Sequence, residues 1–277
     1  GSGGLGRWVV RELLAHGYRV VSADRRPPEE PVRAQHLELD LTDVRAVEEA
    51  LGGCAAAVHL AAIPAPGGRP DEEVFGNNVL GTFALFQAAR NRRVGRVVMA
   101  SSTAALGAAF APRPIGPRYL PIDEAHPLLP RDPYGLSKEV GEQVGAAFGR
   151  GGMSVVALRF HRVTQPGEAA RLAARFDPGS EAAARELGGY VDVRDAARAC
   201  RLGLEAAHIG FEAFNVTAAD TLSRAPTLEL VRRHFPEVEV RGALGAFSSA
   251  WSIAKAARLL GYRPRHSWRA EEPDDPN

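Results

Sequence analysis

Short apolar segments alternate with amphipathic segments along most of the 277 residues. The apolar segments fall at residues 18–23, 37–41, 55–60, 94–100, 153–160 and 211–216. Helical periodicity marks residues 7–16, 43–51, 71–93, 132–150, 195–207, 227–235 and 252–260. A strand that is apolar at nearly every position is buried on both faces, which is typical of a parallel sheet covered by helices on both sides. The pattern therefore predicts an α/β fold with a doubly wound parallel sheet.

A glycine-rich loop, Gly1-Ser2-Gly3-Gly4-Leu5-Gly6, runs directly into the first predicted helix. Glycines let a backbone approach a pyrophosphate, and the amide end of a helix stabilises its negative charge. The strand that follows this helix ends in Asp24, whose carboxylate can accept hydrogen bonds from the ribose hydroxyls of an adenosine. These features predict a dinucleotide site. Arg25 and Arg26 offer positive charge to the 2′-phosphate of NADP, but Asp24 repels that phosphate, so we expect NAD.

A glycine loop of this kind ordinarily follows a strand, and in a doubly wound sheet that strand is central. The sequence begins at Gly1, inside the glycine motif. We expect that the chain is truncated there and lacks the first strand of the sheet, at a cost to its stability and to cofactor binding.

A candidate catalytic pair opens the helix predicted at residues 132–150, which Asp132 can cap. Tyr134 and Lys138 are four residues apart and therefore lie on one helical face. An ammonium group beside a phenol lowers the pKa of the phenol, so Tyr134 is a candidate general acid or base for an alcohol or ketone. Chance explains the pair poorly, because Lys138 and Lys255 are the only lysines among 34 basic residues.

Composition argues against several classes of protein. The net charge is +1, from 34 basic and 33 acidic residues, and gives no sign of a nucleic-acid or anionic-membrane partner. No apolar run approaches the ~20 residues of a membrane span, and no signal peptide is visible. Cys54 and Cys200 lack the spacing of a disulfide or metal site, so we expect buried free thiols, no metal and a cytoplasmic location.

Taken in order, the motifs resemble the extended short-chain dehydrogenase/reductase family, also called the NAD-dependent epimerase/dehydratase family. The resemblance covers essentially the whole chain. It rests on the glycine loop, Asp24, DL at 40–41, HLAA at 59–62, NNVLGT at 77–82, SSTAALG at 101–107, YGLSK at 134–138, LRF at 158–160 and VDVRDAA at 191–197. It implies a dinucleotide-binding Rossmann domain at residues 1–160. Residues 161–277 would form a small substrate lobe, interleaved with the last Rossmann strands and helices.

The resemblance also implies roles for single residues. Ser102, which lies five residues before Gly107, would hydrogen-bond the substrate oxygen, with Thr103 in reserve. Tyr134 and Lys138 would complete the catalytic set, and Lys138 would also bind the nicotinamide ribose. The residues implied to bind the cofactor are Gly3, Leu5, Gly6, Asp24, Arg25, Asp40, Leu41, Leu60, Ala61, Ala62, Ile63, Asn77, Tyr134, Lys138 and His161.

The chain departs from the family pattern at several positions. The first glycine of the fingerprint is absent, Leu106 replaces a frequent tyrosine, and His161-Arg162 replaces an aromatic–asparagine pair. The segment between Arg159 and Tyr190 is short for a lobe that would hold a nucleotide sugar. The chain therefore resembles the compact branch of the family that includes uronate dehydrogenases.

These observations predict an NAD-dependent oxidoreductase that transfers a hydride between nicotinamide and a secondary alcohol or ketone of a small sugar-, polyol- or uronate-like substrate. The alternative is a sugar or nucleotide-sugar epimerase or dehydratase that retains NAD. A third hypothesis, a non-catalytic dinucleotide-binding regulator, is disfavoured by the intact set of Ser102, Tyr134 and Lys138. The family often forms a four-helix dimer interface from the helices at 71–93 and 132–150, which implies a homodimer.

Some residues fit a structural role better than a functional one. Arg171 and Arg175 are four residues apart and could clamp a substrate carboxylate, but in so arginine-rich a chain we favour a solvated helix face. His59 lies inside an apolar strand and is expected to be a hydrogen-bonded core histidine. Residues 191–195 are expected to form a structural strand-to-helix corner.

Three segments lack a strong strand signal. Residues 108–130 are rich in proline and glycine, and we expect a long loop at the rim of the substrate site. The alanine- and arginine-rich stretch up to Leu187 is expected to be helical. The acidic tail from Glu271 is expected to be disordered.

Overall fold

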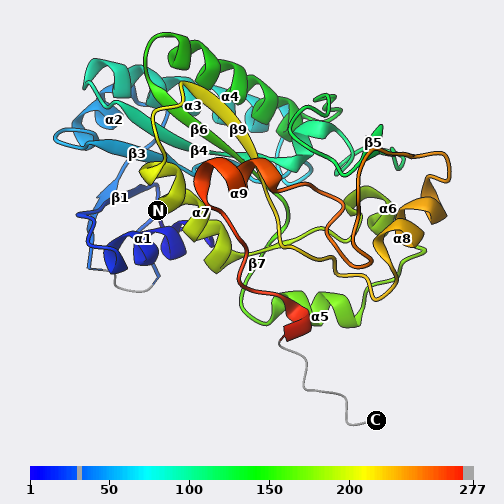
Figure 1. The fold of residues 1–277 in the computed structure, drawn as a ribbon. Helices are drawn as coiled ribbons and strands as arrows, with labels where there is room; N and C mark the ends of the chain where they lie inside the picture. The colour runs from blue at the N-terminus through cyan, green and yellow to red at the C-terminus, as the bar shows by residue number, and fades with distance from the viewer. Residues whose placement is uncertain (30–32, 271–277) are drawn as a thin grey trace.

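The computed structural model describes residues 1–29 and 33–270 (Figure 1). Its helices are α1 (Gly6–Ala15), α2 (Val44–Ala50), α3 (Asp71–Asn91), α4 (Pro133–Arg150), α5 (Glu168–Ala174), α6 (Glu181–Glu186), α7 (Val193–Glu205), α8 (Thr227–His234) and α9 (Ala254–Leu260), with 3₁₀ turns η1 (Thr103–Leu106) and η2 (Trp268–Ala270). Its strands are β1 (Val21–Asp24), β2 (Gln35–Glu38), β3 (Ala56–His59), β4 (Arg96–Ser102), β5 (Tyr119–Leu120), β6 (Ser154–Phe160), β7 (Val163–Thr164), β8 (Val191–Asp192), β9 (Phe211–Val216) and β10 (Glu239–Val240). The predicted α/β class is confirmed. The tail predicted to be disordered lies outside the described residues.

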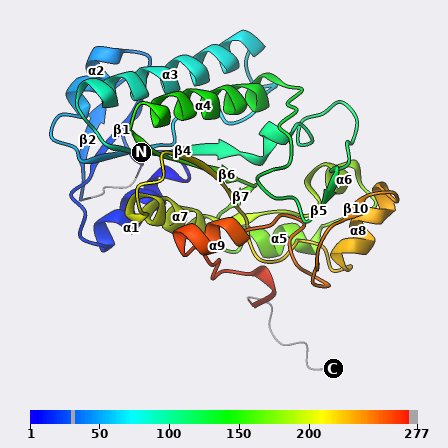
Figure 2. The same cartoon turned by 45° about the horizontal axis from the view of Figure 1, so that its top comes forward.

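The main sheet is parallel and has helices on both faces (Figures 1 and 2). Its strands follow the order β3-β4-β6-β9, while β1 and β2 form a separate parallel pair. Helices α3 and α4 cover one face, and α1, α7 and α9 cover the other. Within the described residues, no strand is hydrogen-bonded between β1 and β3. The two groups of strands are therefore joined by side-chain packing and not by one continuous ladder.

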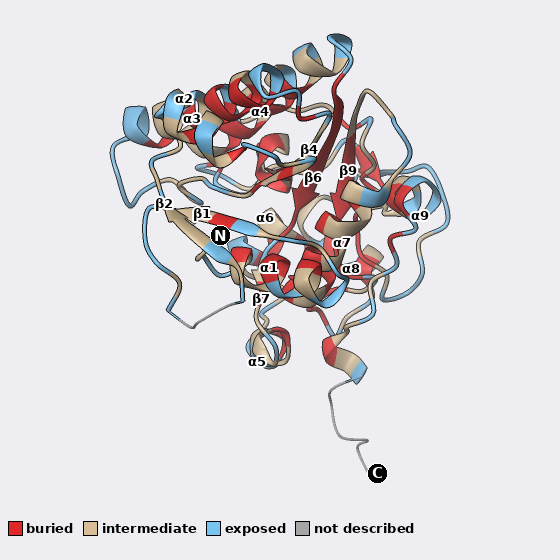
Figure 3. Cartoon of the chain, turned by 90° about the vertical axis from the view of Figure 1, so that its left-hand side faces the viewer, coloured by how far each residue is buried: buried red, intermediate tan, exposed pale blue. Residues whose placement is uncertain are grey.

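Burial explains why the central strands are apolar at almost every position. All seven residues of β6 are buried, and β4, β6 and β9 form the most deeply buried layer of the molecule (Figure 3). Val155 on one face packs with Phe86 and Met99, while Val156 on the other packs with Phe214. Each strand residue therefore meets a core, as in any parallel sheet between two helical layers.

Helix caps match the sequence closely. The side chain of Asp132 accepts a hydrogen bond from the amide of Gly135 (2.8 Å) at the start of α4. Asp192 accepts one from the amide of Arg194 (2.8 Å) at the start of α7, so the expected corner at residues 191–195 is confirmed. Such caps satisfy amides that have no partner inside the helix.

Several predicted segments differ from the structure. Residues 18–20 precede β1 and make no ladder, so the first predicted strand is shorter than expected. The stretch up to Leu187 forms two short helices, α5 and α6, because Pro178 and Gly179 interrupt the helical pattern. Residues 108–130 form a loop as expected, except that β5 pairs with β10.

The second half of the chain contributes to two regions. Strand β9 and helices α7 and α9 complete the layers around the main sheet. Helices α5, α6 and α8 surround two smaller apolar clusters of their own, which contain Trp251 and Trp268. The division at residue 160 stays a prediction. In the described part of the chain, no helix is long and apolar enough to cross a membrane.

Candidate active site

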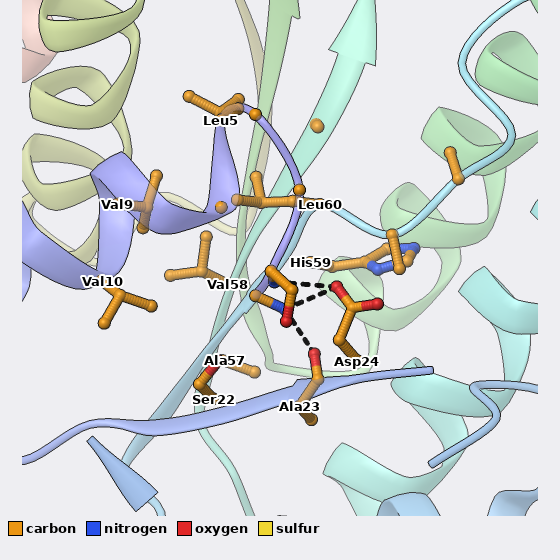
Figure 4. A pocket seen from close by; sticks show the side chains of 18 of the residues that line it. Leu5, Val9, Val10, Ser22, Ala23, Asp24, Ala57, Val58, His59 and Leu60 are labelled. Atoms are coloured by element: carbon orange, nitrogen blue, oxygen red, sulfur yellow. Dashed lines mark hydrogen bonds and ion pairs between the residues drawn. The ribbon is translucent and has the colours of Figure 1, made fainter. Parts of the chain in front are cut away.

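A cavity of about 1960 Å³ runs from the glycine loop past the carboxyl ends of β3 and β4 to the start of α4. Its lower part extends between β1 and β3, where the side chains of Val9 and Val10 on α1 face Ala57 and Val58 (Figure 4). Every residue predicted for the catalytic set or the cofactor site lines this cavity except Asp40. The carboxyl ends of parallel strands are where doubly wound sheets bind ligands.

The glycine loop is tied to the end of β1 by Asp24 (Figure 4). The carboxylate accepts hydrogen bonds from the amide of Ser2 (2.8 Å) and from the amino group of Gly1 (3.1 Å). A Cβ atom at Gly6 would lie 2.5 Å from the carbonyl oxygen of Gly1, so this position requires glycine. A Cβ at Gly3 would meet nothing within 4 Å, which leaves open space beside the loop. The loop therefore has the tight turn and the exposed backbone that a pyrophosphate needs.

Asp40 does not line the cavity itself but contacts Arg25, which does. The Arg25 guanidinium pairs with the carboxylate of Asp40 (2.8 Å) and donates a hydrogen bond to the side chain of Asn77 (2.9 Å). Hydrogen bonds from the amide and hydroxyl of Thr42, then from Arg25, lower the pKa of Asp40 to about 2. Since Arg25 is already paired with a carboxylate, it offers less positive charge to a 2′-phosphate than the sequence alone suggests.

Asn78 fixes the stretch after β3, a role that sequence reasoning missed. Its side chain accepts a hydrogen bond from the amide of Ile63 (2.7 Å) and donates to the carbonyl of the same residue (3.0 Å). It also donates to the hydroxyl of Ser137 on α4 (3.1 Å). The neighbouring Asn77 was predicted as the cavity residue, and it does line the cavity. The second asparagine of the pair connects β3, α3 and α4.

The three predicted catalytic residues come together at the end of β4. Ser102 is the last residue of β4, and its hydroxyl accepts a hydrogen bond from the amide of Ala104 (3.1 Å). Tyr134 and Lys138 project from the first turns of α4, and the Lys138 Nζ atom lies 5.5 Å from the centroid of the Tyr134 ring. The Lys138 ammonium donates to the carbonyl of Ala100 (2.9 Å). Neighbouring elements thus hold the three groups at one wall of the cavity.

The expected lowering of the Tyr134 pKa is wrong for this structure. Burial raises the pKa of Tyr134 above its ordinary value, and the charge of Asp132 raises it further. A hydrogen bond with the Ser102 side chain acts in the opposite direction and is smaller than the effect of burial. The physical reason is that a buried phenolate loses hydration, while the Lys138 ammonium is directed to the carbonyl of Ala100. Tyr134 is therefore protonated at neutral pH.

The cavity beside Tyr134 and His161 is also lined by residues that the motifs did not identify. Phe110 lies edge-on to Tyr134, with ring centroids 5.9 Å apart, and Trp251 lies edge-on to His161 at 5.4 Å. Arg185 lines the same region and donates hydrogen bonds to the carbonyls of Ala111 (3.0 Å) and Pro112 (3.2 Å). The predicted rim loop is thus tied to α6. Phe110 belongs to that loop, but Arg185 and Trp251 carry no local sequence signal.

Arg171 and Arg175 do not form the clamp for a substrate carboxylate that their spacing allows. Both side chains are exposed, and neither lines the cavity, in agreement with the favoured solvated face. His59 is a buried, hydrogen-bonded core residue as expected, with its Nε2 atom 2.9 Å from the Thr82 hydroxyl. Burial lowers the pKa of His59 to about 3. Burial also lowers the pKa of His161 to about 4, so both rings are neutral at neutral pH.

The fold and the site together define a dinucleotide-binding α/β protein with a serine, a tyrosine and a lysine beside the cofactor cavity. Residues 1–217 match the NAD dependent epimerase/dehydratase family. The chain belongs to this family. The predicted cofactor, NAD, is the one in the family's description. No group of three potential metal-binding side chains lies together in residues 1–29 and 33–270.

Known relatives include dehydrogenases and epimerases. The chain is 33% identical over 162 residues to a uronate dehydrogenase from Pseudomonas syringae pv. tomato, which covers 57% of this chain and 55% of the relative. It is 31% identical over 175 residues to a putative UDP-glucose 4-epimerase from Methanocaldococcus jannaschii, which covers 59% of this chain and 54% of the relative. The matches thus span about half the length of these relatives.

A solved structure covers nearly the whole chain. MoeE5 in complex with UDP-glucuronic acid and NAD is 25% identical, with a TM-score of 0.73, and the match covers 97% of this chain and 93% of MoeE5. The predicted sheet and its helical layers therefore recur in a protein solved with NAD. The match extends past β9 into the C-terminal part of the chain, which the family match to residue 217 does not cover.

Proposed function

We propose that the protein is an NAD-dependent oxidoreductase that acts on a secondary alcohol or ketone of a small sugar-, polyol- or uronate-like substrate. The observation that carries this proposal is the convergence of Ser102, Tyr134 and Lys138 on the cavity that begins at the glycine loop. The uronate dehydrogenases among the relatives support a sugar acid as substrate. NAD, when bound, supplies the two-electron acceptor.

The residues of the chain would manage the proton and the negative charge on oxygen. Tyr134 gives its proton to a carbonyl oxygen in reduction and takes the hydroxyl proton in oxidation. Ser102 donates a hydrogen bond to the same oxygen, and Lys138 stabilises the phenolate that forms when Tyr134 gives up its proton. Since burial raises the pKa of Tyr134, the protonated form that donates is the resting one. We therefore propose that oxidation, which starts with the phenolate, accelerates as pH rises.

At the far end of the cavity the positive charge of Arg185 is already paired with a carboxylate, as that of Arg25 is beside the glycine loop. Arg185 lines that end and pairs there with Glu181 (2.8 Å), a residue whose side chain is largely exposed. Phe110 and Trp251 offer flat apolar walls for a sugar ring. These walls support a sugar ring as substrate, while the support for an acidic sugar comes from the uronate dehydrogenases among the relatives.

The test is product analysis with purified protein and NAD over a panel of uronates, aldoses and polyols. Net formation of NADH, read at its absorbance, supports the dehydrogenase. Isomerised sugar without net NADH supports the alternative, an epimerase that retains NAD. We consider this alternative because the relatives include epimerases. If no substrate class gives either NADH or an isomerised sugar, the result contradicts both the dehydrogenase and the epimerase.

We also propose a homodimer through α3 and α4. Leu80 and Phe83 on α3 and Leu136 on α4 are 61%, 47% and 42% exposed, and these two helices pack against each other, so their apolar side chains could meet a second copy of the chain. A strictly monomeric mass in light scattering at micromolar protein would contradict this.

Since both cysteines are free thiols, we propose a reducing, cytoplasmic location. Cys200 is buried as expected, but Cys54 is only partly buried, contrary to expectation.

A further inference from the structure

A buried ion pair lies directly behind the catalytic residues. Glu142 on α4 and Arg159 on β6 form two hydrogen bonds, from Nε to Oε1 (2.8 Å) and from Nη2 to Oε2 (2.7 Å). Their side chains are each only 6% exposed. A two-point arginine–carboxylate contact fixes both position and orientation. Removing one partner leaves the other charge buried without compensation, so this pair constrains the elements that carry it.

The pair belongs to an ordered set of contacts between α4 and β4. Tyr134, Lys138 and Glu142 follow one another at intervals of four residues and share one face of α4. Lys138 donates to the carbonyl of Ala100, and the hydroxyl of Ser101 donates to Glu142 Oε1 (2.6 Å). The next strand residue is the catalytic Ser102. Three consecutive residues at the end of β4 therefore each contact a different turn of the catalytic helix.

Arg159 enters this set from the neighbouring strand. In the parallel ladder of β4 and β6, Arg159 is the register partner of Ser101, so both side chains point to the same face of the sheet. Both reach the same carboxylate, and Arg159 also donates to the carbonyl of Glu124 (3.2 Å). Glu142 is thus held from two strands at once.

Glu142 is also the negative charge that acts on Lys138. Burial lowers the pKa of Lys138 to about 8, and the charge of Glu142 opposes that lowering. The other ionisable groups around Lys138 are Tyr134 on its own helix and His59 on β3, both uncharged at neutral pH. Arg159 lies beyond Glu142 in the chain of hydrogen bonds, and of the two charges Glu142 is the one that acts on Lys138. Without Glu142, Lys138 would be a buried cation with no carboxylate acting on it.

We propose that Glu142, fixed by Arg159, is a positioning residue that keeps Lys138 protonated and holds the catalytic face of α4 in register with the end of β4. Its catalytic meaning rests on the proposed function, because Lys138 matters to turnover only if Tyr134 transfers a proton. The state of charge of Lys138, however, can be measured whether or not a substrate is known.

The scarcity of lysine makes the measurement direct. Protein labelled with ¹³C at lysine Cε gives two lysine signals, from Lys138 and Lys255, and the Lys255→Arg variant assigns them. We expect the Lys138 signal to titrate near pH 8 in the wild type and roughly one pH unit lower or more in Glu142→Gln. The matched control is Glu212→Gln, which removes the carboxylate paired with Lys255 (2.6 Å) and should leave the Lys138 titration unchanged.

Two further measurements keep the proposal open to refutation. If Glu142→Gln fails to fold by circular dichroism, Glu142→Gln/Arg159→Gln removes both buried charges, and the Lys138 titration should still move down. Where a substrate is found, the ratio of wild-type to Glu142→Gln turnover should grow between pH 7 and 9, since the variant loses the Lys138 charge earlier. A folded variant whose Lys138 signal titrates as in the wild type overturns the proposal. Absence of any turnover in the wild type contradicts the proposed function and leaves the titration result standing.

Discussion

Replacing Tyr134 with phenylalanine isolates the proton-transfer step. The ring keeps its edge-on contact with Phe110 and its place beside the Lys138 ammonium, because neither contact involves the hydroxyl. What is lost is the hydroxyl and its hydrogen bond with Ser102. General acid–base catalysis typically contributes ~10²–10⁴ in rate, or about 3–5 kcal/mol of barrier. We expect turnover to fall by at least this factor, while the affinity for NAD stays within a few-fold.

The assay is NADH formation under saturating NAD and substrate, with cofactor affinity measured separately by fluorescence titration. The matched control is Tyr119→Phe, which removes a hydroxyl that donates to Asp123 (2.7 Å) outside the cavity. That variant should keep wild-type turnover. A Tyr134→Phe protein that retains a tenth of the activity would remove Tyr134 from the proposed mechanism, whatever the effect of the control.

Three further outcomes follow from the contacts and the burial of residues in the site. Lys138→Arg should lose nearly as much activity as Tyr134→Phe, since the buried site fits a compact ammonium, and wild-type rates would contradict this. Titration with both cofactors should show tighter binding of NAD, because Asp24 faces the cavity and Arg25 is paired with Asp40; tighter NADP binding would show that arginine dominates. The free energy of unfolding should fall as pH decreases from about 6.5 to 4.5, by up to ~1.4 kcal/mol per pH unit for each of His59 and His161. The reason is that both histidines bind a proton in the unfolded chain over this range, whereas the native rings, with pKa values of about 3 and 4, do not. A constant melting temperature between pH 7 and 5 would refute this.

The sequence predicted the parts of the site that lie in local motifs. A glycine loop before a helix, an acid at a strand end, and tyrosine and lysine on one helical turn each bring their groups together through local geometry. Ser102 lies at the end of β4 as the motif implied, and the strands near the middle of the sheet fall within two or three residues of their predicted positions. Local periodicity is enough for elements that are buried on both faces.

The remainder of the site depends on contacts between distant segments. Arg185 and Trp251 reach the cavity from elements far from any motif, and no local pattern marks either one. The Tyr134 pKa was predicted with the wrong sign because spacing shows a neighbouring charge but not the burial that outweighs it. Asp40 was predicted to line the cofactor site, whereas in the structure it contacts Arg25, which lines the cavity. These errors concern the burial of a side chain and its position relative to the cavity, and both depend on the packing of segments that are distant in the sequence.

Helix α1 joins the glycine loop to the rest of the fold. Val9, Val10 and Leu13 of α1 line the same cavity as the glycine loop, and Figure 4 shows the first two of them. Asp24 ties that loop to β1, but in the described part of the chain no ladder joins β1 to β3. The distance from the loop to Tyr134 is therefore set by the packing of α1 on α7 and of α7 on the main sheet.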